Sequence, residues 1–186
     1  MTQPTSQAHT FKDAYSRSPA AGWLTEPEAQ LLWETARATE GWIVEVGSYQ
    51  GRSTCLLAQL HWPLLCIDPW DNNFDTDLTG DEVFARFRAN IKQLREADPR
   101  VDIHVCRGLV GATQPIGAGF VYLDGDHTFQ GTTEQISFAL RCRPQAIAAH
   151  DVNDSGAGNE VKRACLDLLG PWQQRVERLA VWYLKK

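Results

Sequence analysis

The sequence lacks any run of basic residues. Its 18 lysines and arginines are outnumbered by 23 aspartates and glutamates, which gives a formal net charge of -5 at pH 7. A chain with this balance has no general attraction to nucleic acid or to an anionic membrane surface. The composition therefore argues against both partners and favours small molecules as ligands.

Long apolar stretches are also missing. No segment reaches the roughly 20 apolar residues that a membrane-spanning helix needs. The start, Met1-Thr2-Gln3-Pro4, has neither the positively charged region nor the apolar stretch of a secretory signal. We therefore predict a cytoplasmic protein that does not associate with membranes.

The five cysteines include no Cys-x-x-Cys pair. They are scattered, odd in number and mostly set in apolar segments, which favours reduced thiols in the core over a zinc site or disulfides. Internal repeats and low-complexity blocks are absent as well. With 186 residues, 43% of them hydrophobic, we predict one domain over residues 22–186. Residues 1–21 form a polar segment that is expected to be disordered or laid over the site only when ligand is present.

What the chain does contain is a regular alternation of strand-like and helix-like segments. Strands are expected at 42–46, 63–68, 101–105, 120–123 and 146–152, with a terminal hairpin over 172–184. Helices are expected to start at the Thr25 capping box and at Ser53, and to span 81–94, 132–140 and 159–169. This pattern predicts an α/β fold: a doubly wound, mostly parallel, seven-stranded Rossmann-like sheet with helices on both faces and a C-terminal antiparallel hairpin.

The segment from Trp42 to Thr54 has the pattern of a strand, a tight turn and a helix. Its β-formers are followed by Gly47 and Gly51, and Ser53 then suits the start of a helix. In an open α/β sheet such a turn lies at the carboxyl end of a strand, where glycines let backbone N–H groups approach a ligand. The middle glycine of the dinucleotide fingerprint is missing, so a cofactor without a pyrophosphate fits better.

Four of the predicted strands end in ionisable residues: Glu45, Asp68, Asp124 with Asp126, and His150 with Asp151. Asp68 follows the glycine turn by about 20 positions, the spacing at which a doubly wound fold places a carboxylate on a ribose. All these strand ends are expected on one edge of the sheet. Acids crowded there would repel one another, so we expect a cationic group among them.

Four motifs occur in order along the chain: VEVGSYQGRST at 44–54, CIDPW at 66–70, LDGDHTF at 123–129 and AHD at 149–151. In combination they resemble the successive motifs of class I S-adenosylmethionine-dependent methyltransferases. More narrowly, they are similar to the small group that includes relatives of macrolide-sugar O-methyltransferases and cephalosporin-hydroxylase-like proteins. The resemblance covers residues 22–186 and implies S-adenosyl-L-methionine as the cofactor.

The resemblance implies cofactor-binding roles by position. The residues expected around the methionine part, or at the helix start beneath it, are Glu45, Gly47, Ser48, Gly51 and Ser53. Asp68 would hold both ribose hydroxyls, a role that suits a carboxylate. Gly108 falls where the family contacts the adenine edge. Trp70 either lies against adenine or is a partly buried packing anchor.

The residues Asp124, His127, His150 and Asp151 are the candidates for catalysis. In catechol-type relatives an aspartate and an Asp-Asn pair hold Mg²⁺ at the positions of Asp124 and of the pair 150–151, so the resemblance implies a metal site of Asp124, His150 and Asp151. His150 departs from that pattern. The ion would hold an acceptor hydroxyl in an alkoxide-like form. Alternatively, His127 or His150 acts as a general base without metal, or the aspartates, Asp124 included, only orient the cofactor and cap helices.

We therefore predict methyl transfer to a small-molecule acceptor, at oxygen. One alternative is a nicotinamide-dependent oxidoreductase, which the missing glycine disfavours, and another is a non-catalytic protein that binds S-adenosylmethionine. The acceptor pocket is expected to come from the first twenty residues, from residues 71–80 or 153–158, or from a second subunit of a homodimer.

Overall fold

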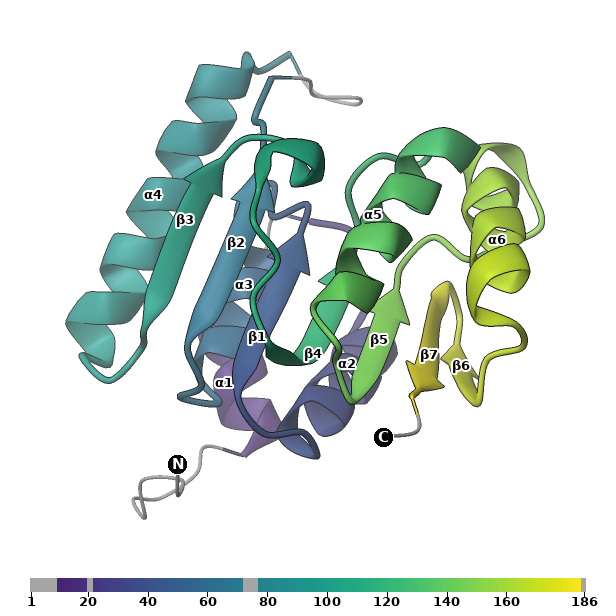
Figure 1. Cartoon of the computed structure of the whole chain (residues 1–186). Helices are drawn as coiled ribbons and strands as arrows, with labels where there is room; N and C mark the ends of the chain where they lie inside the picture. The colour runs from purple at the N-terminus through teal and green to yellow at the C-terminus, as the bar shows by residue number, and fades with distance from the viewer. Residues whose placement is uncertain (1–9, 20–21, 72–76, 185–186) are drawn as a thin grey trace.

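One seven-stranded sheet forms the centre of the molecule (Figure 1). The computed structural model describes residues 10–19, 22–71 and 77–184. The strands are β1 (Trp42–Val46), β2 (Leu64–Asp68), β3 (Ile103–Arg107), β4 (Ala118–Leu123), β5 (Ala146–Ala149), β6 (Gln174–Val176) and β7 (Leu179–Tyr183). Their order in the sheet is β3-β2-β1-β4-β5-β7-β6. Strands β1 to β5 are parallel, and β7 runs antiparallel to both β5 and β6. The predicted mostly parallel sheet with a terminal antiparallel hairpin is confirmed.

Helices cover both faces of this sheet (Figure 1). The first face carries α1 (Phe11–Arg17), α2 (Glu26–Arg37), α3 (Arg52–Ala58) and α4 (Gly80–Ala97), and the second carries α5 (Phe129–Arg141), α6 (Gly156–Leu169) and the 3₁₀ turn η1 (Val110–Ala112). Successive strand residues alternate between the two cores: Ile43 packs in the first and Val44 in the second. Strands buried on both faces are typical of parallel sheets, and their apolar composition follows from it.

The helix α1 lies in the segment that was expected to be a polar lead-in. Thr10 and Asp13 form a reciprocal capping box at its start. Seven residues are too few for a stable isolated helix, so tertiary contacts must hold it. Ala14 is fully buried, and the Gln59 side-chain amide donates to its carbonyl at 3.0 Å. This differs from the expected disordered or ligand-dependent lead-in because the partner that orders the helix lies 45 residues away.

Several boundaries also differ from the prediction. Helix α5 begins at Phe129 because the Thr128 hydroxyl accepts from the N–H of Gly131, and α6 begins at Gly156. Strand β3 lies two residues later than expected, at Ile103–Arg107. Residues 1–9, 20–21 and 72–76, which belong to segments predicted to form the lead-in or the acceptor pocket, lie outside the described residues.

Membrane insertion finds no support among the helices. Within residues 10–19, 22–71 and 77–184, none of them is both long and apolar enough to cross a bilayer.

Candidate functional site

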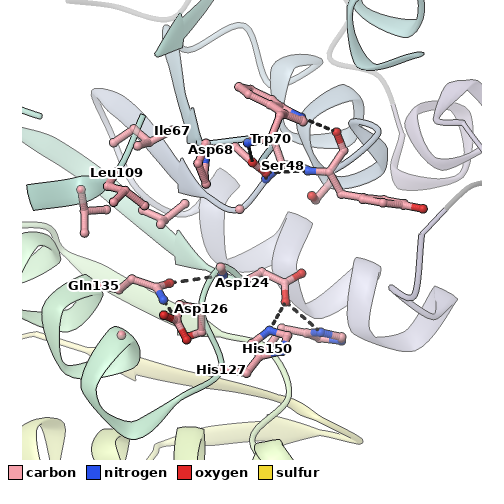
Figure 2. Close-up of a pocket in the computed structure, with 18 of the residues that line it drawn as sticks. Ser48, Ile67, Asp68, Trp70, Leu109, Asp124, Asp126, His127, Gln135 and His150 are labelled. Atoms are coloured by element: carbon pink, nitrogen blue, oxygen red, sulfur yellow. Dashed lines mark hydrogen bonds and ion pairs between the residues drawn. The ribbon is translucent and has the colours of Figure 1, made fainter. Parts of the chain in front are cut away.

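A cavity of about 420 Å³ opens at the carboxyl edge of the parallel strands. Its walls come from the ends of β1 to β5 and from residues 22–24, which precede α2. The predicted site residues that line it are Gly47, Ser48, Ser53, Asp68, Trp70, Gly108, Asp124, His127, His150 and Asp151. Figure 2 shows Ser48, Asp68 and Trp70 on one side, and Asp124, His127 and His150 on the other. The strand order therefore brings the predicted residues together in two groups.

The glycine turn depends on close backbone contact between β1 and β4. Gly47 has a φ of 84°, and a Cβ atom there would lie 2.1 Å from the carbonyl oxygen of Asp124. Gly51 has a φ of 90° and is the N-cap of α3. Both positions therefore require glycine, for conformation and, at Gly47, for space. Gly51 shapes the turn without lining the cavity.

Glu45 lies beneath this turn and is fully buried. Its carboxylate accepts a hydrogen bond from the Ser48 hydroxyl at 2.7 Å and another from the Thr54 hydroxyl. Burial raises the pKa of Glu45 to about 6, against the opposing effect of these hydroxyl donors. Glu45 does not line the cavity, so its observed contacts brace the turn, in contrast to the expected place beside the methionine part.

Asp68 closes the cavity at the end of β2. One carboxylate oxygen accepts from the N–H groups of Ser48 at 2.7 Å and Tyr49 at 3.0 Å, and the other accepts from the N–H of Trp70 at 2.7 Å. Burial raises the pKa of Asp68, although these three N–H donors oppose the shift. The carboxylate is held rigidly at the cavity wall, and of its roughly four acceptor sites one stays open, on Oδ1, for a hydroxyl donor.

Trp70 has its indole in the core beside this carboxylate. The ring is 2% exposed and lies 4.7 Å from the ring of Phe84 and 4.8 Å from that of Phe87, between centroids. Its N–H donates to the carbonyl of Tyr49 at 2.8 Å. Of the two roles left open by the sequence, this geometry matches the packing anchor. The apolar part of the nearby wall comes from Ile67, and from Leu109 and Val110 after Gly108.

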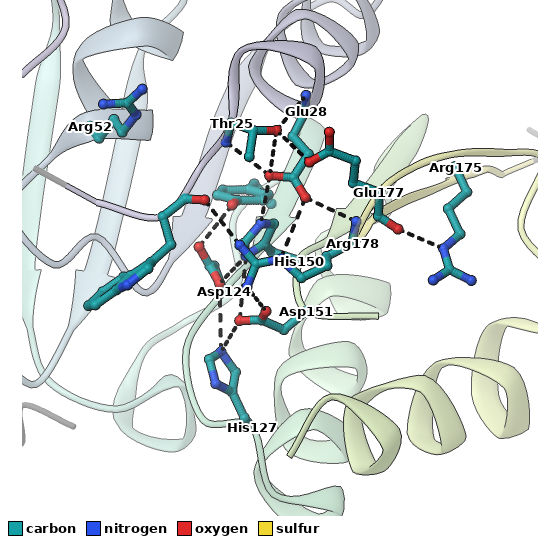
Figure 3. A network of polar contacts seen from close by, with 12 residues as sticks. Thr25, Glu28, Arg52, Asp124, His127, His150, Asp151, Arg175, Glu177 and Arg178 are labelled. Atoms are coloured by element: carbon teal, nitrogen blue, oxygen red, sulfur yellow. Dashed lines mark hydrogen bonds and ion pairs between the residues drawn. The ribbon is translucent and has the colours of Figure 1, made fainter. Parts of the chain in front are cut away.

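Six ionisable side chains meet on the other side of the cavity (Figure 3): Glu28, Asp124, His127, His150, Asp151 and Arg178. His150 lies between two acids, with Nε2 3.2 Å from Glu28 Oε2 and Nδ1 3.3 Å from Asp124 Oδ1. His127 Nε2 lies 3.6 Å from both Asp124 Oδ1 and Asp151 Oδ2. Arg178 Nη1 donates to Asp151 Oδ1 at 2.8 Å. We call this set the charged cluster.

Residues 44–152 match a protein-family model described as a methyltransferase domain. The match covers more than half of the 186 residues. The chain belongs to this methyltransferase family. With its fold, this makes it a class I S-adenosylmethionine-dependent methyltransferase, as the motifs suggested. A search of curated proteins finds no significant match to the sequence.

Solved structures of other methyltransferases share the fold. CalS11, a TDP-rhamnose 3'-O-methyltransferase of calicheamicin biosynthesis, is 15% identical with a TM-score of 0.61, and the match covers 95% of this chain and 92% of CalS11. An O-methyltransferase from Bacillus cereus is 15% identical with a TM-score of 0.61, over 93% of this chain and 87% of that one. The O-methyltransferase TomG from Streptomyces achromogenes is 17% identical with a TM-score of 0.59, over 94% and 89% of the two chains.

In this methyltransferase the charged cluster contains its own cations. Burial opposes ionisation of His150, but Asp124, Asp151 and Glu28 together raise its pKa to about 12. Glu28 shows the reverse: burial opposes its charge, and the nearby His150 together with hydrogen bonds from the backbone of Thr25 and Arg178 lowers its pKa to about 2. The carboxylate of Asp124, 3.6 Å from Nε2, raises the pKa of His127. The acids are thus balanced by two imidazoles and a guanidinium.

The donor set does not fit Mg²⁺. Among the described residues, the group that could surround a cation is Asp124, His127 and Asp151, whose ligand atoms lie within 4.8 Å of one another. His150, expected as a ligand, lies deeper and is 2% exposed. Mg²⁺ prefers oxygen ligands in an octahedron, whereas this set includes an imidazole and a carboxylate already bonded to Arg178. The cationic group expected among the acids is supplied by the protein itself.

Sequence reasoning missed three residues of this site. Glu28 was interpreted only as part of a capping box, which it does form with Thr25, while its other oxygen accepts from the N–H of Arg178 at 3.0 Å. Arg178 lies in the hairpin turn and carried no motif. Trp23, which also lies in none of the four motifs, lines the cavity. Residues 153–158 were expected to contribute to the acceptor pocket. They do not line this cavity.

Proposed function

We propose that this methyltransferase transfers a methyl group from S-adenosylmethionine to a hydroxyl oxygen of a small-molecule acceptor, without a resident metal ion. The observation that carries the proposal is the pairing of two features in one cavity. One is the rigid glycine turn with the carboxylate of Asp68, and the other is His127 between two carboxylates. The names of CalS11, TomG and the Bacillus cereus enzyme, all O-methyltransferases, support oxygen as the methylated atom.

The residues on the turn side fit the cofactor. The turn from Gly47 to Ser53 would hold the methionine part, Asp68 the ribose hydroxyls, and the apolar wall at Leu109 the adenine. Asp124, at the boundary with the charged cluster, would face the sulfonium charge. When bound, the cofactor supplies a methyl group on positively charged sulfur, which an acceptor oxygen displaces as the S–C bond breaks.

His127 is the better placed of the two candidate bases. Its side chain is 32% exposed and lines the cavity, whereas His150 is 2% exposed and its two ring nitrogens face the carboxylates of Glu28 and Asp124. Asp124 and Asp151 face Nε2 of His127, so they orient the ring and stabilise the imidazolium that forms when the other nitrogen, Nδ1, takes the acceptor proton. Because Asp124 raises its pKa, His127 must lose its proton before each turnover, so activity should rise with pH through this raised pKa.

The charged cluster takes over the electrostatic role that a metal has in catechol-type enzymes. Arg178 and His150 already engage the carboxylates that would hold the ion. Dialysis against EDTA should therefore leave turnover unchanged, and added Mg²⁺ or Mn²⁺ should not raise it. A turnover that disappears on chelation and returns with either ion would overturn this part of the proposal.

Calorimetry with S-adenosylhomocysteine, S-adenosylmethionine and NADH tests the cofactor. We expect both sulfur compounds to bind and NADH not to bind. Turnover is then followed as S-adenosylhomocysteine release against a panel of small hydroxyl, amine and thiol compounds, with His127→Ala as the matched inactive variant. Methylation at nitrogen or sulfur alone would refute O-methylation, and NADH binding alone would refute the whole proposal.

A further inference from the structure

Trp23 and Leu109 are the two most exposed large hydrophobic side chains among the described residues, at 52% and 62%. Both line the cavity of the site. They belong to opposite sides of it: Leu109 follows β3, and Trp23 contacts the hairpin turn beyond β5. The proposed position of adenine accounts for Leu109. The residues proposed to hold the cofactor do not include Trp23.

Trp23 is held in place by two contacts. Its carbonyl accepts a hydrogen bond from Arg178 Nη2 at 3.1 Å. Its indole packs against the ring of Tyr49, with 5.0 Å between centroids and a tilt of 40°. Tyr49 also lines the cavity. The first contact fixes the backbone of Trp23 and the second orients its indole, so the exposed ring presents a preformed surface, which loses little conformational entropy when a ligand covers it.

Arg178 connects this surface to the reacting groups. The same guanidinium that donates to Trp23 donates through Nη1 to Asp151 at 2.8 Å, and Asp151 contacts His127 at 3.6 Å. The backbone N–H of Arg178 donates to Glu28, so the residue is fixed at its own base as well. One side chain therefore connects the backbone of Trp23, which carries the indole, to the acid beside the proposed base.

We propose that Trp23 forms the acceptor wall of the cavity and that the acceptor presents the flat face of a ring to it, with Arg178 as the residue that positions this wall. The inference rests on the proposed function. An indole pairs best with another flat face, either an aromatic ring or the apolar face of a pyranose. Open-chain alcohols offer no such face and would gain little there.

Binding of simple ring probes to the protein loaded with S-adenosylhomocysteine tests this. The probes are phenol, methyl α-D-glucopyranoside and glycerol, each titrated by calorimetry or by saturation-transfer NMR. We expect one of the two ring probes to bind and glycerol not to bind, and the ring probe that binds identifies the acceptor class as aromatic or carbohydrate. Equal binding of glycerol, or no binding of either ring probe, would overturn the inference.

Variants distinguish a role of Trp23 in binding the acceptor from a role in maintaining the fold. Trp23→Ala should lower the affinity for the ring probe about tenfold, and Trp23→Phe should restore most of it. The affinity for S-adenosylhomocysteine should stay unchanged in both variants. Arg178→Gln should weaken the ring probe in the same way, and Arg178→Lys should rescue it partly. Arg175→Gln is the matched control, because Arg175 lies on the same hairpin and donates to the carbonyl of Glu177 at 3.0 Å.

Failure of this inference differs from failure of the proposed function. If S-adenosylhomocysteine does not bind, the proposed function fails before any probe is added. If it binds and the ring probe is insensitive to Trp23→Ala, the acceptor wall lies elsewhere and only this inference is wrong.

Discussion

The two sides of the cavity are built in different ways. On the proposed cofactor side, Asp68 is held by backbone N–H groups of Ser48, Tyr49 and Trp70, which belong to the turn and to its own strand end. On the other side, the charged cluster joins side chains from α2, from the ends of β4 and β5 and from the hairpin turn, and its members Glu28 and Arg178 lie 150 residues apart. A site built from backbone groups depends on the positions of glycines and on the spacing of residues along the sequence. A side-chain network depends on every member, because each one neutralises another.

The largest effect is expected from His127→Ala. Loss of a general base lowers turnover by about 10²–10⁴-fold, while affinity for S-adenosylhomocysteine should stay within a few-fold because the cofactor side is untouched. Steady-state kinetics and calorimetry on the same preparation measure both. A variant that loses cofactor binding together with turnover would show that the two sides are not separable.

His150→Ala should have the largest effect on stability. The substitution leaves the buried Glu28 and the partly buried Asp124 without their shared partner, which costs about 3–5 kcal/mol in the free energy of unfolding. His104→Ala removes a similar contact, to Asp102 at 3.0 Å, but at the surface, and should cost less than about 1 kcal/mol. Urea denaturation compares the two. Equal losses would contradict the view that the cluster is held by buried charge pairs.

Asp68→Ala tests the cofactor side alone. Removing hydrogen bonds to a charged acceptor costs about 1.5–3 kcal/mol, so affinity for S-adenosylhomocysteine should fall by about 10–150-fold. Asp102→Ala, which changes an exposed acid before β3, is the control and should leave the affinity unchanged. If Asp68→Ala binds normally, the ribose does not lie at this carboxylate.

The most gradual effect is that of pH on stability. Glu28 has a pKa of about 2 in the folded protein against 4.5 for the free group, so its contribution is present above pH 4.5 and lost as pH falls. His150 has a pKa of about 12 against 6.5, so its contribution is complete below pH 6.5 and lost as pH rises. Each group changes the stability by at most about 1.4 kcal/mol per pH unit.

These two groups together place the stability maximum between pH 4.5 and 6.5. Melting temperatures measured from pH 3 to 9 in wild type and in His150→Ala check this. The alkaline decline should be weaker in the variant. A wild-type protein that becomes more stable from pH 6 to 9 would show that His150 is not a buried cation.

The sequence by itself determined the cofactor side. The alternation of elements, the glycine turn at Gly47 and Gly51 and the position of Asp68 all follow from local periodicity and from the geometry of parallel strands. It also placed Asp124, His127, His150 and Asp151 at one edge. Gly47 lies next to the Asp124 carbonyl in a conformation that favours glycine. The glycine turn can therefore be recognised from one sequence.

Only the tertiary structure decided what the charged residues do. His150 lies between two acids because Glu28 arrives from α2, and Asp151 is hydrogen-bonded because Arg178 arrives from the hairpin. The sequence did not predict the helix α1 or the position of Trp23, for the same reason. Side-chain partners far apart in sequence leave no periodic or spacing signal, since their meeting depends on how the helices and strands pack.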